Sequence, residues 1–451
     1  MIKSKKQQLL PLLLLCIATH SMAQSTIRHV KKYTINPVSI VGFDDAADKD
    51  KCTVEIANNV SKKDDLLSFD ASPKDDNSGQ MDPQVAVGVN HVLALTNTSI
   101  AAFDKKGKLL KATNLHCFTG SVWGIDPKIF YDRDNKYFGF AVHDYESKKE
   151  KKPMRFLLSK TDNPLDGWNK YSVDAPDAED GGSIGYGNKW IVYEYPTQKG
   201  SAVFVFNAQD AKAGKPVKVY KFFADVGQPV FNQDNGNTYF IRTNQDDKKL
   251  VLSTIGERKG EPVIQQVWSV DNPSEFTEGP PVSHQKGTNT TISSGDFNPK
   301  NAVIQNKSVW ISHAVKDGDY AAIEWFELSL KDGAVVQNGF VSAEGTNFIH
   351  PSIAVNKRGD MAIGFQEVNK DMFVSARLVH RLVGDEKNTL RQYKEVAEGN
   401  SPFKPSKNAE NQPWGDYSGT TVDGDNGINF WSAQTMMTDK AVRAIVFRLK
   451  L

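Results

Sequence analysis

The sequence predicts an all-β fold, a single seven-bladed β-propeller, and three observations support it. The 451 residues include 33 Gly, 20 Pro and 10% aromatic side chains, a composition typical of many short strands joined by turns. A sequence motif that predicts two strands recurs seven times along the chain. Apolar residues at helical spacing do not persist over the length of a helix in any window, which excludes a helical solenoid.

The first 23 residues predict a signal peptide. Three lysines precede an apolar run, residues 9–18, and Ala23 completes a small-residue cleavage site before Gln24. The run is about half of the ~20 apolar residues that a membrane span needs. We therefore expect a secreted or periplasmic protein without a membrane span.

Charge and cysteine content agree with export. Without the signal peptide the chain carries 52 basic and 54 acidic side chains, a balance that predicts no nucleic-acid partner. Two cysteines remain, Cys52 and Cys117, an even number in an exported protein. Either they form a disulfide or both remain thiols.

Residues 24–81 are predicted to precede the propeller domain, residues 82–451. Only one strand, Val442 to Leu449, follows Trp431, so the last blade lacks a strand. The alternating segment from His29 to Val41 is expected to pair there and close the ring. The charged stretch from Phe43 to Met81 predicts a surface loop.

The repeated motif predicts where each blade begins. A polar residue, often followed by Pro, opens an alternating strand, a turn follows, and a dense apolar strand comes next. The copies start at positions 82, 126, 181, 228, 300, 350 and 416. Their spacing matches about 40 to 50 residues for a four-stranded blade plus insertions. The largest insertions are Asn272–Phe297 and Ala397–Gly415. A β-sandwich is the alternative, since seven hairpins can also pair into two sheets.

Five stretches carry a resemblance to a known family: Ser159–Trp168, Gly287–Ala302, Trp325–Gly339, His350–Phe365 and Trp414–Gln434. Together they resemble the secreted bacterial sialidase-like (BNR-repeat-like) seven-bladed β-propeller proteins, over most of residues 82–449. The resemblance implies the fold. It does not imply one function, because such propellers host hydrolases, lyases and binding proteins.

Polar residues are expected to converge at the pore mouth. In a propeller, the start of the innermost strand and the end of the next strand lie at the same face. Carboxylates, His and Arg around one cavity are what glycoside chemistry requires. The candidate catalytic residues are His143, Glu194 and His313, and the candidate ligand-binding residues are Asp126, Arg242, His350, Glu367 and Asp416. The alternative is that the Asp-Pro starts are turn and capping residues.

The sequence thus predicts a protein that binds an extracellular glycan at the pore mouth and, if catalytic, cleaves it as a glycoside hydrolase or polysaccharide lyase. True sialidase activity is not expected, because only Arg242 of the three required arginines lies near the mouth. Ca²⁺ or another divalent ion held by the Asp and His ring is the one cofactor considered. The alternative function is a non-catalytic protein-interaction scaffold. We expect a monomer whose partner is a carbohydrate or a protein.

Overall fold

The structure is a computed structural model, and the residues that it describes are 26–40, 42–43, 52–74, 79–121, 124–144, 152–232, 234, 236–244, 248–276, 278–404, 411–412, 414–439 and 441–451. The predicted signal peptide, residues 1–23, lies outside the described residues. Parts of the segment 24–81 also lie outside them.

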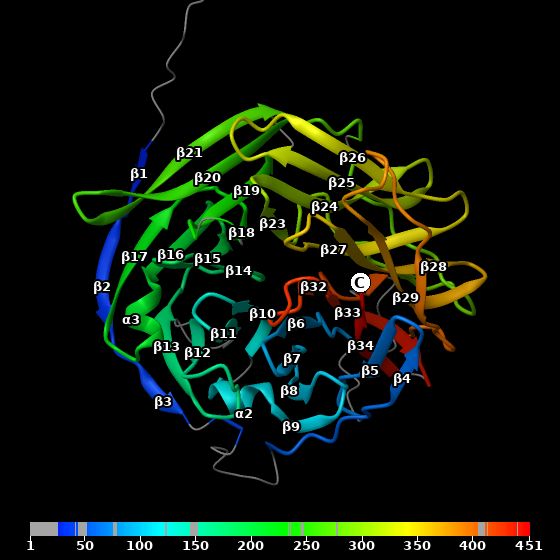
Figure 1. Ribbon diagram of the computed structural model, residues 1–451, viewed down its shortest axis with the longest axis horizontal. Helices are drawn as coiled ribbons and strands as arrows, with labels where there is room; N and C mark the ends of the chain where they lie inside the picture. The colour runs from blue at the N-terminus through cyan, green and yellow to red at the C-terminus, as the bar shows by residue number, and fades with distance from the viewer. Residues whose placement is uncertain are drawn as a thin grey trace, which may run out of the picture.

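Antiparallel four-stranded meanders stand around a common centre, with the first strand of each nearest to it (Figure 1). The first meander holds β6 (Gln84–Val87), β7 (His91–Leu95), β8 (Ser99–Asp104) and β9 (Leu109–Asn114). The second holds β10 (Gly124–Asp132), β11 (Tyr137–Asp144), β12 (Pro153–Ser159) and β13 (Trp168–Asp174). The third holds β14 (Ser183–Tyr186), β15 (Trp190–Thr197), β16 (Gly200–Asn207) and β17 (Val217–Phe223).

The chain continues around the centre in the same way. The fourth meander holds β18 (Gln228–Asn232), β19 (Tyr239–Asn244), β20 (Lys249–Arg258) and β21 (Glu261–Asp271). The fifth holds β23 (Ala302–Gln305), β24 (Ser308–Asp317), β25 (Tyr320–Ser329) and β26 (Val335–Val341). The sixth holds β27 (Asn347–Val355), β28 (Met361–Asn369), β29 (Met372–Arg381) and β30 (Lys394–Ala397). The last chain segment forms β32 (Gly419–Val422), β33 (Phe430–Thr438) and β34 (Ala441–Leu449).

This all-β arrangement is consistent with a β-propeller. Each of the seven predicted repeat starts lies in, or within a few residues before, the first strand of one of these units. A short parallel pairing of β18 with β23, through Phe231 with Val303 and Asn232 with Ile304, joins the fourth and fifth meanders into one sheet.

The N-terminal segment pairs differently from the prediction. The strand that pairs with β34 is β5 (Leu66–Asp70), itself paired with β4 (Val60–Lys63). The prediction that residues 29–41 pair with residues 442–449 is therefore wrong. The predicted surface loop from Phe43 to Met81 contains both of these strands.

The segment 26–40 instead runs along the outer rim of three sheets (Figure 1). Its strands β1 (Thr26–Arg28), β2 (Lys31–Ile35) and β3 (Val38–Ile40) pair with β21, β17 and β13. The difference has a physical reason. β5 buries Leu67 and Phe69 almost completely, whereas β1 and most of β2 remain exposed. The more apolar strand occupies the position that is packed on both sides.

Apolar and aromatic side chains fill the space between neighbouring sheets. Phe156 of the second meander packs edge to face on Tyr193 and Phe206 of the third. Trp168, which is fully buried, contacts Phe118 and Phe140 and donates its indole N–H to the Pro164 carbonyl. Such interdigitated aromatic contacts hold adjacent sheets in register around the centre.

The two insertions predicted from the repeat spacing meet each other. Residues 291–292 form β22 and pair in parallel with β31, residues 411–412. Near this pairing, Ile292, Phe403 and Trp414 join one buried apolar cluster. The two insertions therefore pack against the fifth, sixth and last sheets, and together they are called the cap below.

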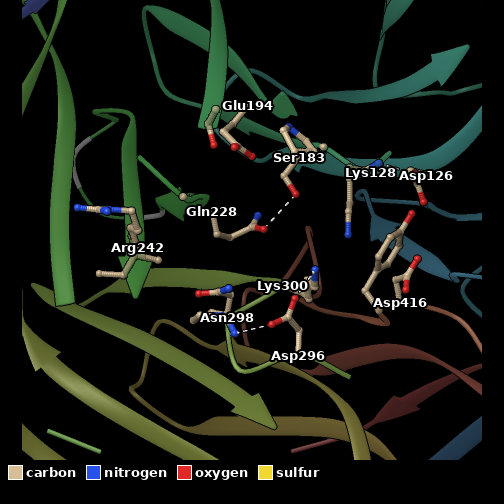
Figure 2. A pocket seen from close by; sticks show the side chains of 18 of the residues that line it. Asp126, Lys128, Ser183, Glu194, Gln228, Arg242, Asp296, Asn298, Lys300 and Asp416 are labelled. Atoms are coloured by element: carbon tan, nitrogen blue, oxygen red, sulfur yellow. Dashed lines mark hydrogen bonds and ion pairs between the residues drawn. The ribbon is translucent and has the colours of Figure 1, made fainter. Parts of the chain in front are cut away.

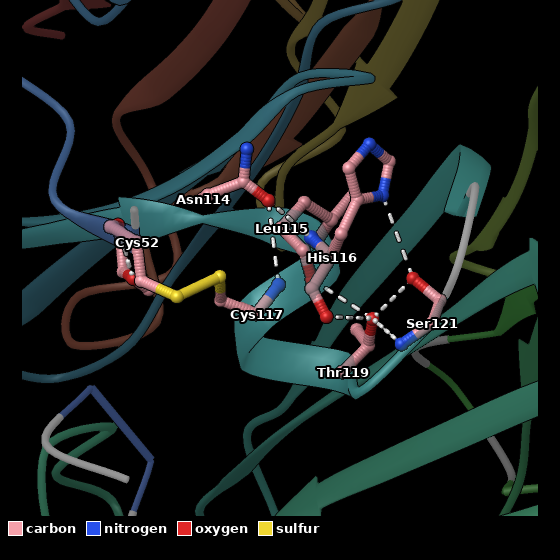
Figure 3. The surroundings of a disulfide bond; sticks show 8 residues. Cys52, Asn114, Leu115, His116, Cys117, Thr119 and Ser121 are labelled. Atoms are coloured by element: carbon pink, nitrogen blue, oxygen red, sulfur yellow. Dashed lines mark hydrogen bonds between the residues drawn. A yellow bond between two sulfur atoms is a disulfide. The ribbon is translucent and has the colours of Figure 1, made fainter. Parts of the chain in front are cut away.

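A disulfide joins Cys52 to Cys117 (Figure 3). Cys117 lies in the short helix α2 (Leu115–Thr119), where the Asn114 side chain accepts bonds from the backbone N–H groups of His116 and Cys117. The bond closes a loop with a sequence separation of 65, which corresponds to about 4 kcal/mol in the chain-entropy account. The other described helix is α3 (Ala208–Lys212). Within the described part of the chain, no helix has the length and apolarity to cross a membrane.

Candidate functional site

A cavity of about 620 Å³ lies against the inner strands β10, β14 and β18 (Figure 2). The segments that lead into β23 and β32 complete its wall. Ionisable side chains dominate the lining. The acids are Asp126, Asp180, Glu194, Asp225, Asp296 and Asp416, and the bases are Lys128, Arg242 and Lys300. Ser183 and Gln228 add a hydrogen-bonded pair, 3.0 Å between Oγ and Oε1.

Two of the three cations are held in ion pairs. Arg242 Nη1 lies 2.7 Å from Asp225 Oδ2, and Lys300 Nζ lies 3.0 Å from Asp296 Oδ2. Burial alone would lower the pKa of Lys300, but the attraction of Asp296 outweighs it and raises that pKa. Both ion pairs lie in the wall of the cavity.

Glu194 is the carboxyl group best placed to act as an acid. It lies on β15 opposite Ser183 in the strand register and is half-buried at the cavity wall. Burial raises the pKa of Glu194 to about 7, although a hydrogen bond from Ser201 opposes the shift. A carboxyl group that keeps its proton near neutral pH is suited to general acid catalysis.

The Asp-Pro starts have a structural role as well. Asp82 and Asp126 adopt φ values of 43° and 54°, in the left-handed region, which costs a non-glycine residue about 1 to 3 kcal/mol. In this conformation their carboxylates reach the next inner strand. Asp82 Oδ1 accepts a bond from the Asp416 N–H (2.6 Å), and Asp126 Oδ2 accepts one from the Gly181 N–H (3.1 Å). The capping interpretation therefore describes a real contact at both positions.

Two buried carboxylates, one exposed carboxylate and one buried lysine form a cluster at the cavity wall. Carboxylate oxygens of Asp82, Asp126 and Asp416 lie within 4.8 Å of one another. Burial raises the pKa of Asp126 well above its usual value, and the nearby Asp82 charge adds to this shift. The Lys128 amine lies over the Tyr417 ring, beside the cluster. Burial, the largest cause, lowers the pKa of Lys128 to about 7.

This cluster does not fit a Ca²⁺ ion. Ca²⁺ takes about six to eight oxygen ligands, and the cluster offers three carboxylates. Both oxygens of Asp82 already accept bonds, from the Asp416 N–H and from Asn97 Nδ2 (2.8 Å). The Lys128 amine occupies the same region. We therefore assign no metal-dependent chemistry to these residues.

The structure brings four of the predicted site residues together at this cavity: Asp126, Glu194, Arg242 and Asp416. His143, on β11, is fully buried and does not line it. Burial lowers the pKa of His143 to about 4. Of the predicted residues at the ends of second strands, Glu194 and Arg242 line this cavity, whereas His143 and His313 do not.

The remaining predicted residues are buried beneath the cap. His313 Nε2 lies 2.8 Å from Glu324 Oε2, and its Nδ1 lies 2.6 Å from the Phe297 carbonyl. His350 Nε2 lies 3.1 Å from the Ser293 carbonyl. Phe297 and Ser293 both belong to the first insertion. The insertion therefore occupies the space into which these two histidines were expected to open.

Glu367 is also engaged in the interior. Its Oε2 accepts a bond from Arg377 Nε (2.6 Å), and its Oε1 accepts one from Tyr393 Oη (3.2 Å). Both ionised side chains of the pair are almost fully buried. Glu367 is placed as a structural ion-pair partner, away from the cavity.

Sequence reasoning missed Lys128 and Lys300 as members of the site. Lys128 carried a usable signal. It occupies the second position after the repeat start, where other copies have Val230, Ala302 or Ser352. A lysine in place of a small or apolar residue on an innermost strand indicates a special environment. Lys300 carried a positional signal, since position 300 is one of the predicted repeat starts, although it lies in an irregular segment before β23.

Comparisons with known proteins do not assign the chain to a family. No family model matches the sequence, and no curated protein matches it. Among solved structures, a protein of unknown function from Dyadobacter fermentans is similar over 94% of this chain and 99% of its own, with 11% identity and a TM-score of 0.40. A subtype N10 neuraminidase-like protein of A/little yellow-shouldered bat/Guatemala is similar over 69% of this chain and 96% of its own, with 11% identity and a TM-score of 0.37.

PorZ, described as a surface component of the type-IX secretion system of Porphyromonas gingivalis, is similar at 9% identity with a TM-score of 0.39. The alignment covers 81% of this chain and 38% of PorZ, so the chain spans less than half of that protein's length. Likenesses at these TM-scores carry no argument about function.

Proposed function

We propose that the protein is an exported β-propeller that binds an extracellular glycan in the central cavity and hydrolyses a glycosidic bond there. The observation that carries the proposal is Glu194, a half-buried carboxyl group with a pKa of about 7 in the wall of a 620 Å³ cavity. A cavity of this size suits a small ligand.

We infer seven blades for the propeller. The support is the coincidence of the seven repeat starts with seven inner strands. Closure would come from the antiparallel pairing of β34 with β5, which adds a fourth strand to the last unit. Closing a ring in this way leaves no open gap between the first and last blades.

Export is supported by two features. The N-terminal residues have the pattern of a signal peptide. The Cys52–Cys117 disulfide is typical of proteins that fold in an oxidising compartment. Both features favour the periplasm or the extracellular medium, where glycans are available.

The chemistry follows from the residues around the cavity. Glu194 would protonate the leaving oxygen of the glycosidic bond, and the exposed carboxylate of Asp416, which also lines the cavity, would act on water. Ser183, Gln228 and Asn298 offer hydrogen bonds to sugar hydroxyl groups. Arg242 is already paired with Asp225, so we do not propose the three-arginine clamp of a sialidase.

The test is a screen of the mature protein against a panel of glycosides and polysaccharides. On the best substrate, Glu194→Gln should lower kcat by about 10² to 10⁴-fold, the usual contribution of a general acid. Glu395→Gln, a change at an exposed position on β30, is the matched control and should leave kcat unchanged.

Two outcomes would overturn the proposal. One is full turnover in the Glu194→Gln variant. The other is the absence of binding and turnover across the panel, together with a specific protein partner in pull-downs, which would favour the interaction scaffold.

A further inference from the structure

Two lysines of the cavity wall have opposite surroundings. Lys300 is ion-paired with Asp296 at 3.0 Å. Lys128 has only 6% of its surface exposed, and no carboxylate oxygen among the described residues lies within ion-pair distance of its Nζ. Its amine nevertheless lines the cavity. A buried amine at a cavity wall, with no ion-pair partner among the described residues, is suited to bind a ligand or to react with one.

The backbone aims Lys128 at the cavity. The pairing of β10 with β11 shifts register between Ile125 and Lys128, and Asp126 in this bulge has φ 54°. A bulge of this kind redirects the following side chain. The Lys128 side chain then extends over the face of the Tyr417 ring. The position of the Lys128 side chain therefore follows from the β-bulge in β10.

The surroundings of Lys128 lower the pKa of its amine, whereas those of Lys300 raise the pKa of its amine. Burial and the charge of Lys300 lower the pKa of Lys128 to about 7, against the attraction of Asp126, Asp82 and Asp416. Near neutral pH a large share of Lys128 therefore lacks its extra proton. A neutral lysine amine is a good nucleophile toward carbonyl groups.

We propose that Lys128 Nζ attacks the carbonyl carbon of an aldehyde, such as the open-chain form of a reducing sugar, and forms an imine. A C–N bond forms as the carbonyl oxygen takes a proton and becomes a hydroxyl group. The C–O bond then breaks, and the oxygen leaves as water. The nitrogen loses two protons over the sequence, so the reaction is balanced without an oxidant or reductant.

Asp126 is the proton donor for this step. Its carboxyl group lies in the same cluster, lines the cavity and favours its protonated form. It can pass a proton to the departing oxygen and recover one from the nitrogen. This inference goes beyond the proposed function, because imine formation requires neither a glycosidic bond nor Glu194.

The experiment traps the imine in the wild-type protein. The full mature chain is incubated at pH 7.5 with glyceraldehyde and sodium cyanoborohydride, and the reduced adducts are mapped by peptide mass spectrometry. Lys128 should be labelled about 100-fold or more faster than Lys300, because a lysine with an ordinary or raised pKa is almost wholly protonated at this pH. Labelling of Lys128 should decline as the pH falls below 7.

Lys300 in the same cavity is the internal control, so the measurement needs no variant that has to fold. Glu395→Gln, at an exposed position on β30, should leave the labelling of Lys128 unchanged, and because the readout is an adduct rather than turnover of a glycoside, it separates this inference from the proposed hydrolysis. If Lys128 remains unlabelled while surface lysines react, or reacts no faster than Lys300, the inference is wrong. Lys128 would then be an internal counterion for the three carboxylates.

Discussion

The polar residues at the strand starts and strand ends occupy equivalent positions in the repeat, but they form two groups that differ in whether a ligand can reach them. We call these groups the open half and the capped half. Asp126, Glu194 and Arg242 line an open cavity, whereas His313 and His350 are buried beneath the insertions. Repeat symmetry determines which side chains lie at strand starts and strand ends. The insertions determine which of them a ligand can reach.

In the capped half, side chains that the repeat places at strand starts and strand ends contact other residues of the protein. His313 and His350, for example, contact backbone carbonyl groups of the first insertion. Two buried acid–base pairs lie there, His313 with Glu324 and Arg377 with Glu367. In the open half the ion pair of Arg242 with Asp225 remains partly in water, with 21% and 59% of the side chains exposed. Loss of one partner should therefore have very different consequences in the two halves.

The largest expected effect separates the two arginines. Arg377→Met leaves Glu367 buried without its main partner, and should lower the free energy of unfolding by about 3 to 5 kcal/mol. Arg242→Met leaves Asp225 in contact with water, and should lower it by less than about 1 kcal/mol. Urea denaturation of both variants measures the difference. Equal losses would show that the open and capped halves do not differ in this way.

The second effect concerns the pH dependence contributed by Glu194. Its pKa is about 7 in the folded protein and near 4.5 when unfolded, so the folded state holds more protons between these values. The wild type should therefore lose stability as the pH rises from 4.5 to 7, by about 1 to 3 kcal/mol.

Glu194→Gln should remove this loss. The difference in stability between the variant and the wild type should therefore shift in favour of the variant as the pH rises from 4.5 to 7. Thermal denaturation of both proteins across this range measures it. If their pH profiles coincide, Glu194 is as well solvated as an ordinary surface carboxylate.

The smallest effect has the opposite sign and comes from the capped half. Burial lowers the pKa of His350, so the unfolded state binds more protons below pH 6.5 and stability falls as the pH falls. His350→Asn should reduce this acid sensitivity. Asn also tolerates the positive φ of 47° at this position. The same thermal series from pH 7 to pH 4.5 measures the change, and an unaltered acid slope would contradict the burial argument.

Sequence patterns predicted the strands better than the partners of the terminal strands. Polar starts followed by apolar alternation coincide with the first strand of each unit. The pairing of β34 with Leu66–Asp70 was not predictable from spacing, because residues 29–41 alternate equally well. What distinguishes the two segments is the burial of Leu67 and Phe69, which depends on the neighbouring sheets.

The site was predicted in part for a related reason. Asp126, Glu194, Arg242 and Asp416 lie where repeat symmetry places them, at the cavity. The symmetry contains no information about the path of the insertions, which bury His313 and His350. Lys128 lies within an innermost strand, whereas the predicted site residues were taken only from the starts and ends of strands.

Carboxyl labelling tests the difference between the two halves most directly. The folded protein is treated with a water-soluble carbodiimide and glycine ethyl ester, and labelled sites are mapped by peptide mass spectrometry. Glu194 in the open half should react before the protein unfolds, whereas Glu367 and Glu324 in the capped half should react only after unfolding. Reaction of Glu367 in the folded protein at the rate of Glu194, or no reaction of Glu194, would contradict the account.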